Sequence, residues 1–149
     1  QLIELPQSME EPIPIELDGS RVEIEWIPSI HVPLCYAFRI NRQLIITGDT
    51  AYNPALCDFA QNSTLLIHET ALFDGMEELA KRVNHSTPSQ AATIARKAKI
   101  SKLVCYHLPE LTFNEEAGFI QNACKLFQPI VIAHDGDVIE IEKINKNCN

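Results

Sequence analysis

The sequence predicts a domain of the α/β class, and three observations support this prediction. The chain has 149 residues, a length typical of a single domain. Hydrophobic residues make up 46% and charged residues 21%, which is the composition of a globular protein rather than of a disordered chain. Strand-like patterns dominate before Thr64, whereas strands and helices alternate after it. Such alternation is typical of a sheet that carries helices on at least one face.

The N-terminal part is expected to contain irregular chain followed by strands. Residues 1–20 include three prolines and end in a turn signal, so we expect no regular element there. Apolar and charged residues alternate from Val22 to Ile27, the pattern of a half-buried strand. Two further strands, with a hairpin turn between them, are expected at Cys35–Ile40 and Gln43–Thr47.

The rest of the chain is expected to alternate between helices and buried strands. Thr87 is a good N-cap residue because Pro88 takes the first helical position and Gln90 completes a capping box, so a helix begins there. Small residues follow on one face of this helix, which suits close packing on a sheet. Other helices are expected at Pro54–Gln61, Gly75–Val83 and Asn114–Phe127. Other strands are expected at Thr64–His68, Leu103–Tyr106, Pro129–His134 and Val138–Ile141.

Charge and cysteine content restrict the class of protein. The net charge of −8 favours solubility and disfavours non-specific binding to nucleic acid. No two of the five cysteines have C-x-x-C spacing, which indicates reduced thiols, so we expect a cytoplasmic protein. No apolar run approaches the ~20 residues of a membrane span, and no signal peptide is visible. Since the first residue is Gln1 rather than Met, we expect a processed product or a fragment.

Side chains that bind metals or move protons follow successive predicted strands. Ligands gather at the carboxyl ends of strands in open α/β sheets, so we expect several of these side chains to meet at one sheet edge. Histidines and carboxylates together suit Zn²⁺ or Mn²⁺. The side chains in question are His31, Asp49, His68, Glu69, His85, His107, His134 and Asp135.

Several of these residues also have a structural interpretation. His68 follows three apolar residues and is better explained as a core histidine, and His134 as part of a turn. His85 precedes a helix, where a capping cluster explains it as well as catalysis does. Asp49 has a possible turn role, but Gly48 permits a close backbone approach and favours a functional one. Glu69 needs a partner if it is buried.

Taken in order, these motifs resemble the metallo-β-lactamase superfamily, and within it the ribonuclease Z-like branch of tRNA 3′-processing endonucleases. The resemblance covers roughly His31 to His107, with G-D-T at 48–50, L-L-I-H-E-T at 65–70 and N-H-S-T at 84–87. It implies that the chain is the C-terminal αβ half of an αββα sandwich. The metal ligands that it implies are His31, Asp49 and His107. The implied catalytic pair is Glu69 and His85, which position and protonate the leaving oxygen.

The resemblance also implies a cofactor and a missing part. The expected cofactor is Zn²⁺, two ions per complete site, with Mn²⁺ as an alternative. The first metal motif of the family, H-x-H-x-D-H, is absent from the sequence. We therefore expect residues 1–149 to form one domain that lacks the His-rich N-terminal half. A half-fold exposes an apolar sheet face, so the chain is expected to form a homodimer or to pair with the missing half.

Three functional hypotheses follow. The first is a metal-dependent hydrolase, a phosphodiesterase or ribonuclease Z-like endoribonuclease that is incomplete as given, with a phosphodiester such as RNA as its substrate. The second is a non-catalytic structural or subunit-pairing domain. The third is a metallo-hydrolase of another ester, a thioester or a lactone. Leu108-Pro109-Glu110 replaces the Phe-Ser-x-Arg-Tyr segment of the ribonuclease branch and keeps the third hypothesis open.

Overall fold

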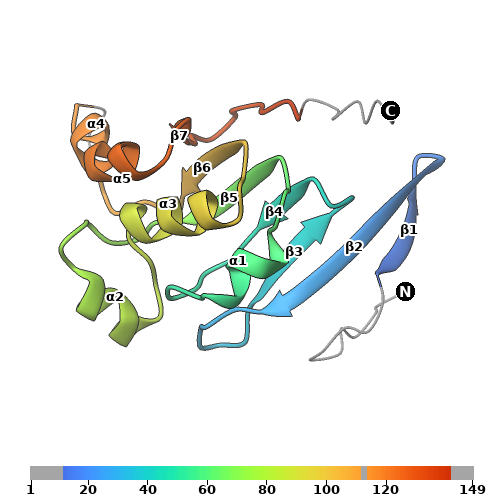
Figure 1. Cartoon of the computed structure of the whole chain (residues 1–149), viewed down its shortest axis with the longest axis horizontal. Coiled ribbons are helices and arrows are strands. Elements are labelled where there is room, and N and C mark those ends of the chain that lie inside the picture. The colour runs from blue at the N-terminus through green and yellow to red at the C-terminus, as the bar shows by residue number, and fades with distance from the viewer. Residues whose placement is uncertain (1–11, 112–113, 142–149) are drawn as a thin grey trace.

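The computed structural model describes residues 12–111 and 114–141, and this part of the chain contains a seven-stranded mixed sheet (Figure 1). The strands lie in the sheet in chain order, from β1 to β7. The first four pair antiparallel: β1 (Ile13–Leu17), β2 (Ser20–Pro28), β3 (Tyr36–Ile40) and β4 (Leu44–Ile46). The next three run parallel to β4 and to one another: β5 (Leu65–Glu69), β6 (Lys102–Tyr106) and β7 (Ile130–Ile132). The α/β class is confirmed.

Helices connect the parallel strands and cover one face of the sheet, where α1, α3 and α5 lie together (Figure 1). The helices are α1 (Ala55–Phe59), α2 (Glu77–Val83), α3 (Pro88–Lys97), α4 (Glu116–Phe119) and α5 (Gln121–Leu126). The capping box of α3 is present as predicted, because Thr87 and Gln90 exchange hydrogen bonds. None of the helices in the described part of the chain has the length and hydrophobicity that crossing a bilayer requires.

The core lies between α3 and the sheet. Its helix contributes a face of small residues, and the strands contribute larger ones opposite them, so the helix axis approaches the sheet closely. The helix residues are Ala91, Ala92, Ile94 and Ala95. The strand residues include Ile45, Leu66, Leu103 and Cys105.

The other face of the sheet carries an apolar groove over strands β1 to β4. The groove has a volume of about 300 Å³. Its lining residues are Ile13, Ile15, Ile24, Trp26, Phe38, Ile40 and Ile46. An apolar sheet face of this kind is the feature expected of a half-fold.

Three predicted elements were wrong, each for a physical reason. Residues 13–17 form a strand, because the chain turns at Asp18-Gly19 and pairs with β2; Pro14 is tolerated because β1 is an edge strand. Residues 138–141 form no strand, because no described segment pairs with them beyond β7. The helix expected at Asn114–Phe127 is divided into α4 and α5 at Ile120, which leaves helical geometry two residues after Gly118, a poor helix former.

Candidate active site

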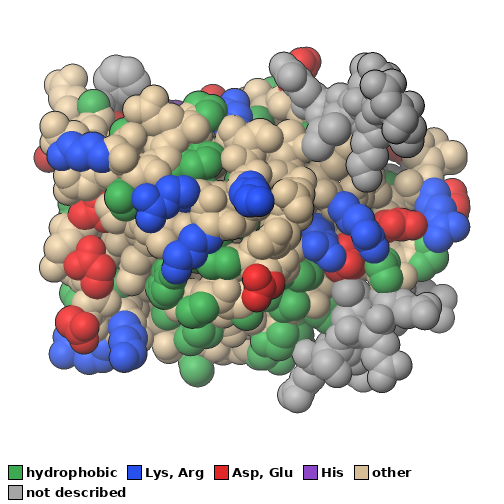
Figure 2. Space-filling view, in the orientation of Figure 1, with side chains coloured by type: hydrophobic (Ala, Val, Ile, Leu, Met, Phe, Trp, Pro, Cys, Tyr) green, Lys and Arg blue, Asp and Glu red, His purple; other side chains and the backbone are tan. Residues whose placement is uncertain are grey.

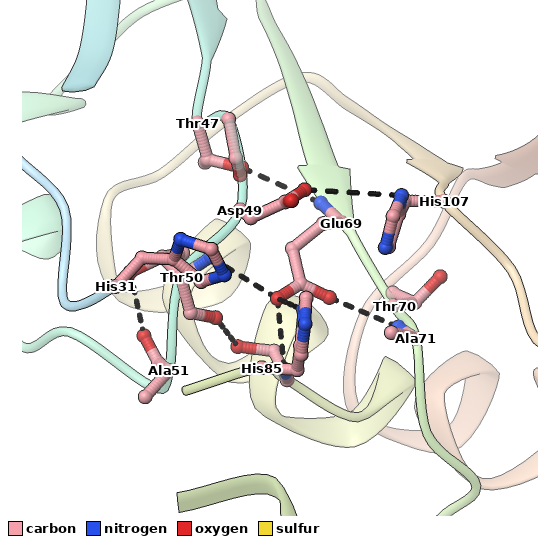
Figure 3. Close-up of polar contacts among 12 residues, drawn as sticks. His31, Thr47, Asp49, Thr50, Ala51, Glu69, Thr70, Ala71, His85 and His107 are labelled. Atoms are coloured by element: carbon pink, nitrogen blue, oxygen red, sulfur yellow. Dashed lines mark hydrogen bonds and ion pairs between the residues drawn. The ribbon is translucent and has the colours of Figure 1, made fainter. Parts of the chain in front are cut away.

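Five of the predicted site residues lie together at the carboxyl ends of the parallel strands (Figure 3). Asp49 follows β4, Glu69 is the last residue of β5 and His107 follows β6. His31 comes from the loop between β2 and β3, and His85 from the loop between α2 and α3. The parallel register of β4, β5 and β6 aligns these strand ends and so brings distant parts of the sequence together.

Three of these residues form a group with the spacing of a metal site. One ligand atom each from His31, Asp49 and His85 lies within 4.8 Å of the others. Two imidazoles and a carboxylate are a donor set that fits Zn²⁺ or Mn²⁺. His107 lies at the edge of this group, with its Nδ1 3.8 Å from the Asp49 Oδ1 and its ring stacked on that of His85 at 5.3 Å.

Glu69 is completely buried, and its carboxylate accepts four hydrogen bonds. One oxygen accepts from the backbone N–H groups of Thr50 (3.1 Å) and Ser86 (3.0 Å) and from Nδ1 of His85 (3.0 Å). The other accepts from the backbone N–H of Ala71 at 2.9 Å. These four hydrogen bonds satisfy both oxygens of the buried Glu69 carboxylate and hold it in place.

The Nδ1 atoms of two histidines are occupied, which assigns their tautomers. Nδ1 of His31 lies 3.1 Å from the carbonyl oxygen of Pro33, and Nδ1 of His85 lies 3.0 Å from Glu69. Both partners only accept hydrogen bonds, so the proton resides on Nδ1. Nε2 of each ring is then left for a metal or a substrate, the arrangement found in metal-binding histidines.

Hydroxyl groups that the sequence did not single out join the segments of the site. The Ser86 hydroxyl donates to the carbonyl of Thr50 at 2.7 Å, and the Thr50 hydroxyl accepts from the backbone N–H of Ile30 at 3.0 Å. These two contacts connect the three loops that carry the metal-ligand candidates. Their position in the sequence could have identified Thr50 and Ser86, because each directly follows a candidate site residue in G-D-T or N-H-S-T.

The backbone before Asp49 requires glycine. Gly48 has a φ of +59°, and a Cβ at this position would lie 2.5 Å from the Cys35 Sγ and 3.1 Å from the Tyr36 carbonyl oxygen. The left-handed turn and the close approach of β3 direct the chain out of β4 into the site. His107 also has a positive φ, of 52°, which is uncommon for a non-glycine residue and marks a strained position at the site.

The remaining candidates lie outside this cluster. His68 is completely buried on the helix-covered face, and Nδ1 contacts the backbone oxygen of Glu69 at 2.7 Å. Burial lowers its pKa to about 4, and its interpretation as a core histidine is confirmed. His134 is exposed and bonds to Glu116 at 2.8 Å, and its backbone N–H donates to Asp137 within a turn that contains Asp135.

The chain is similar to known proteins both in sequence and in structure. No family model matches the chain. The chain is 34% identical over 132 residues to Ribonuclease Z of Myxococcus xanthus. The matched region covers 88% of this chain and 40% of that protein. It is 36% identical over 103 residues to Ribonuclease Z of Gemmatimonas aurantiaca. That match covers 69% of this chain and 33% of the relative.

Solved structures show the same likeness in fold. The metallo-β-lactamase fold protein YhfI of Bacillus subtilis superposes with a TM-score of 0.74 at 27% identity, over 88% of this chain and 53% of that one. The chain resembles the ribonuclease Z-like branch of the metallo-β-lactamase fold. The short form of human tRNase Z shows the same fold, with a TM-score of 0.64 at 23% identity over 85% of this chain and 46% of that one.

The matched region is a part of each relative. The chain spans about two fifths of the Myxococcus Ribonuclease Z and about half of YhfI. Its seven-stranded sheet with helices therefore corresponds to a portion of the metallo-β-lactamase fold. The resemblance that the motifs predicted is confirmed.

Proposed function

We propose that the chain contributes the C-terminal part of the active site of a metal-dependent phosphodiesterase of the ribonuclease Z type, with RNA as its substrate. The observation that carries the proposal is that the buried carboxylate of Glu69 holds His85, which lies in one group with the metal-ligand candidates His31 and Asp49. The similarity to proteins named Ribonuclease Z supports it.

In this proposal His31, Asp49 and His107 hold the metal, for which Zn²⁺ is the first candidate and Mn²⁺ the second. Such ions, when bound, polarise phosphoryl oxygens and make water a stronger nucleophile at neutral pH. Asp49 would suit a bridging role, because its carboxylate lies within 4.8 Å of ligand atoms of His31 and His85 and its Oδ1 lies 3.8 Å from Nδ1 of His107.

Glu69 and His85 would transfer the proton that the leaving oxygen requires. The carboxylate fixes the orientation of the imidazole by accepting a hydrogen bond from Nδ1. A proton taken up at Nε2 of His85 would then be donated to the oxygen that leaves the phosphorus. General acid catalysis of this kind contributes about 10²–10⁴-fold in rate.

The proposed site needs ligands from outside this sequence. The chain has five histidines and no H-x-H-x-D-H motif, and it spans about two fifths of the Myxococcus Ribonuclease Z. Three ligands do not saturate two ions that each require four or more. We place the missing ligands on a segment that packs over the apolar groove of β1 to β4. That groove also favours the second candidate function, a non-catalytic pairing domain.

The test is metal content and hydrolysis measured on the same samples. The full reading frame that encodes this chain is expressed without chelators, and bound Zn and Mn are counted by plasma mass spectrometry. Hydrolysis of bis(p-nitrophenyl) phosphate and of a short RNA is then followed. About two ions per chain and metal-dependent turnover are expected. Metal-free, inactive protein would contradict the proposal and leave the pairing domain.

Variants separate the roles within the site. Asp49→Asn should lower metal content and turnover together, because it weakens the central carboxylate. His85→Ala should lower turnover by about 100-fold or more while metal content stays unchanged. A parallel loss of metal in His85→Ala would instead identify His85 as a ligand, which its place in the three-residue group permits. His134→Ala, an exposed histidine outside the cluster, is the matched control.

A further inference from the structure

A cleft of about 530 Å³ lies directly beside the candidate active site. Three of its lining residues are sequence neighbours of site residues: Ile30 precedes His31, Ala51 follows Thr50 and Asn84 precedes His85. A substrate held at the histidine cluster therefore has this cleft as its immediate neighbour. The volume is ample for a planar ring system of one or two rings.

One wall of the cleft is suited to a flat, apolar ring. Tyr52 is half-buried and packs against the hydrophobic core, and its hydroxyl accepts a hydrogen bond from Nζ of Lys97 at 3.2 Å. These contacts hold the ring in place before a ligand arrives. Ile30, which is 44% exposed, adds an apolar surface from the loop that carries His31. Figure 2 shows hydrophobic side chains gathered along the lower edge of the molecule, where this loop lies.

The same cleft offers an unused amide. The side chain of Asn84 is half-buried and makes no hydrogen bond within the described residues. Its backbone has a φ of 63° and forms the left-handed C-cap of α2, so its position is fixed. An amide provides a donor and an acceptor together, the combination that pairs with the edge of a nucleobase.

The charges of the cleft argue against a second phosphate. Glu77 and Glu78 line it together with Lys81, and Lys97 stands at the Tyr52 wall, so the cleft carries no excess of basic groups that would attract a dianionic phosphate. An uncharged ring that carries N–H donors has no such requirement.

We infer that this cleft binds a nucleobase next to the scissile phosphodiester, with Tyr52 as a stacking surface and Asn84 as a hydrogen-bonding partner. The inference rests on the proposed phosphodiesterase function, since it assigns the substrate group adjacent to the reacting one. It makes the protein selective for nucleotides over simple phosphate esters.

The test is a nuclear magnetic resonance titration with adenosine, cytidine and uridine of the ¹⁵N-labelled protein, expressed from the full reading frame that encodes this chain. Saturable shifts are expected for the side-chain amide of Asn84 and for the backbone amides of residues 51, 52 and 84. Ribose 5-phosphate, which has the sugar and the phosphate but no base, should leave these signals in place. Neither metal nor turnover is needed for the measurement.

Two variants and two matched controls identify the contacts. Tyr52→Leu should weaken nucleoside binding by about 5- to 150-fold, because it removes the stacking surface. Asn84→Gly keeps the left-handed cap and removes only the amide, so it should weaken binding by about two- to tenfold. Tyr36→Leu changes a half-buried tyrosine that does not line the cleft. Asn62→Gly changes an asparagine with a φ of 59° that also lies outside it. Both controls should bind normally.

The outcomes separate this inference from the proposed function. Absence of saturable shifts with any nucleoside, or equal shifts with ribose 5-phosphate, would overturn the nucleobase site whatever the hydrolysis assay shows. Unchanged affinity in both Tyr52→Leu and Asn84→Gly would overturn it as well. Nucleoside binding without metal-dependent hydrolysis would remove the proposed function and leave a base-binding cleft.

Discussion

Replacement of Glu69 by glutamine exchanges one carboxylate oxygen for an NH₂ group at the centre of the site and tests how the fold supports this residue. The carboxylate accepts hydrogen bonds on both oxygens, three on one and one on the other. Glutamine keeps the shape but turns one acceptor into a donor. If the amide oxygen stays with Thr50, Ser86 and His85, the NH₂ group faces the backbone N–H of Ala71.

The cost follows from this geometry. The Ala71 N–H loses its acceptor in a buried place, which costs about 1–3 kcal/mol. The three remaining hydrogen bonds change from charge-assisted to neutral, and each loses about 1 kcal/mol. Since folded domains have about 5–15 kcal/mol of stability, the loss of about 4–6 kcal/mol in the free energy of unfolding would leave Glu69→Gln close to unfolding.

The measurement is urea unfolding followed by the fluorescence of Trp26, which is the single tryptophan and is 2% exposed. A large fall in the midpoint is expected for Glu69→Gln. Glu78→Gln, at an exposed glutamate, serves as the control and should change stability by at most about 0.5 kcal/mol. A loss below about 1 kcal/mol in Glu69→Gln would show that the four contacts do not stabilise the fold as argued.

Two further predictions use the same unfolding assay. Gly48→Ala should destabilise the protein by about 1–3 kcal/mol, because the added Cβ meets the Cys35 Sγ and the φ of this residue is positive. Adding Cys35→Ala to this variant should restore only the stability lost to the steric clash. Full recovery of stability would exclude backbone strain. His134 should make stability pH-dependent, since its hydrogen bond to the Glu116 carboxylate raises its pKa in the folded state. The contribution of His134 to the free energy of unfolding is complete below the pKa that this histidine has in the unfolded chain, about 6.5. It is lost as the pH rises through the higher pKa of the folded state. The free energy of unfolding should therefore fall less between pH 6 and 8.5 in Glu116→Gln than in the parent chain, and identical pH profiles would refute this.

Local patterns predicted the elements that depend on local interactions. The capping box at Thr87 was recognisable because both of its hydrogen bonds join residues three positions apart. The strands of the sheet interior were recognisable from their short apolar runs. Residues 13–17 and 138–141 were predicted wrongly in opposite directions, because an edge segment becomes a strand only if a neighbour supplies hydrogen bonds.

The order of the motifs along the sequence determined which residues to consider and which family the chain resembles. Only the tertiary structure decided which atoms meet. Glu69 draws its four donors from loops that follow three different elements, and the cleft takes its walls from the β2–β3 loop, the chain after β4 and α2. Contacts of this kind are set by the parallel alignment of β4, β5 and β6 and by packing at long range, which no short stretch of sequence contains.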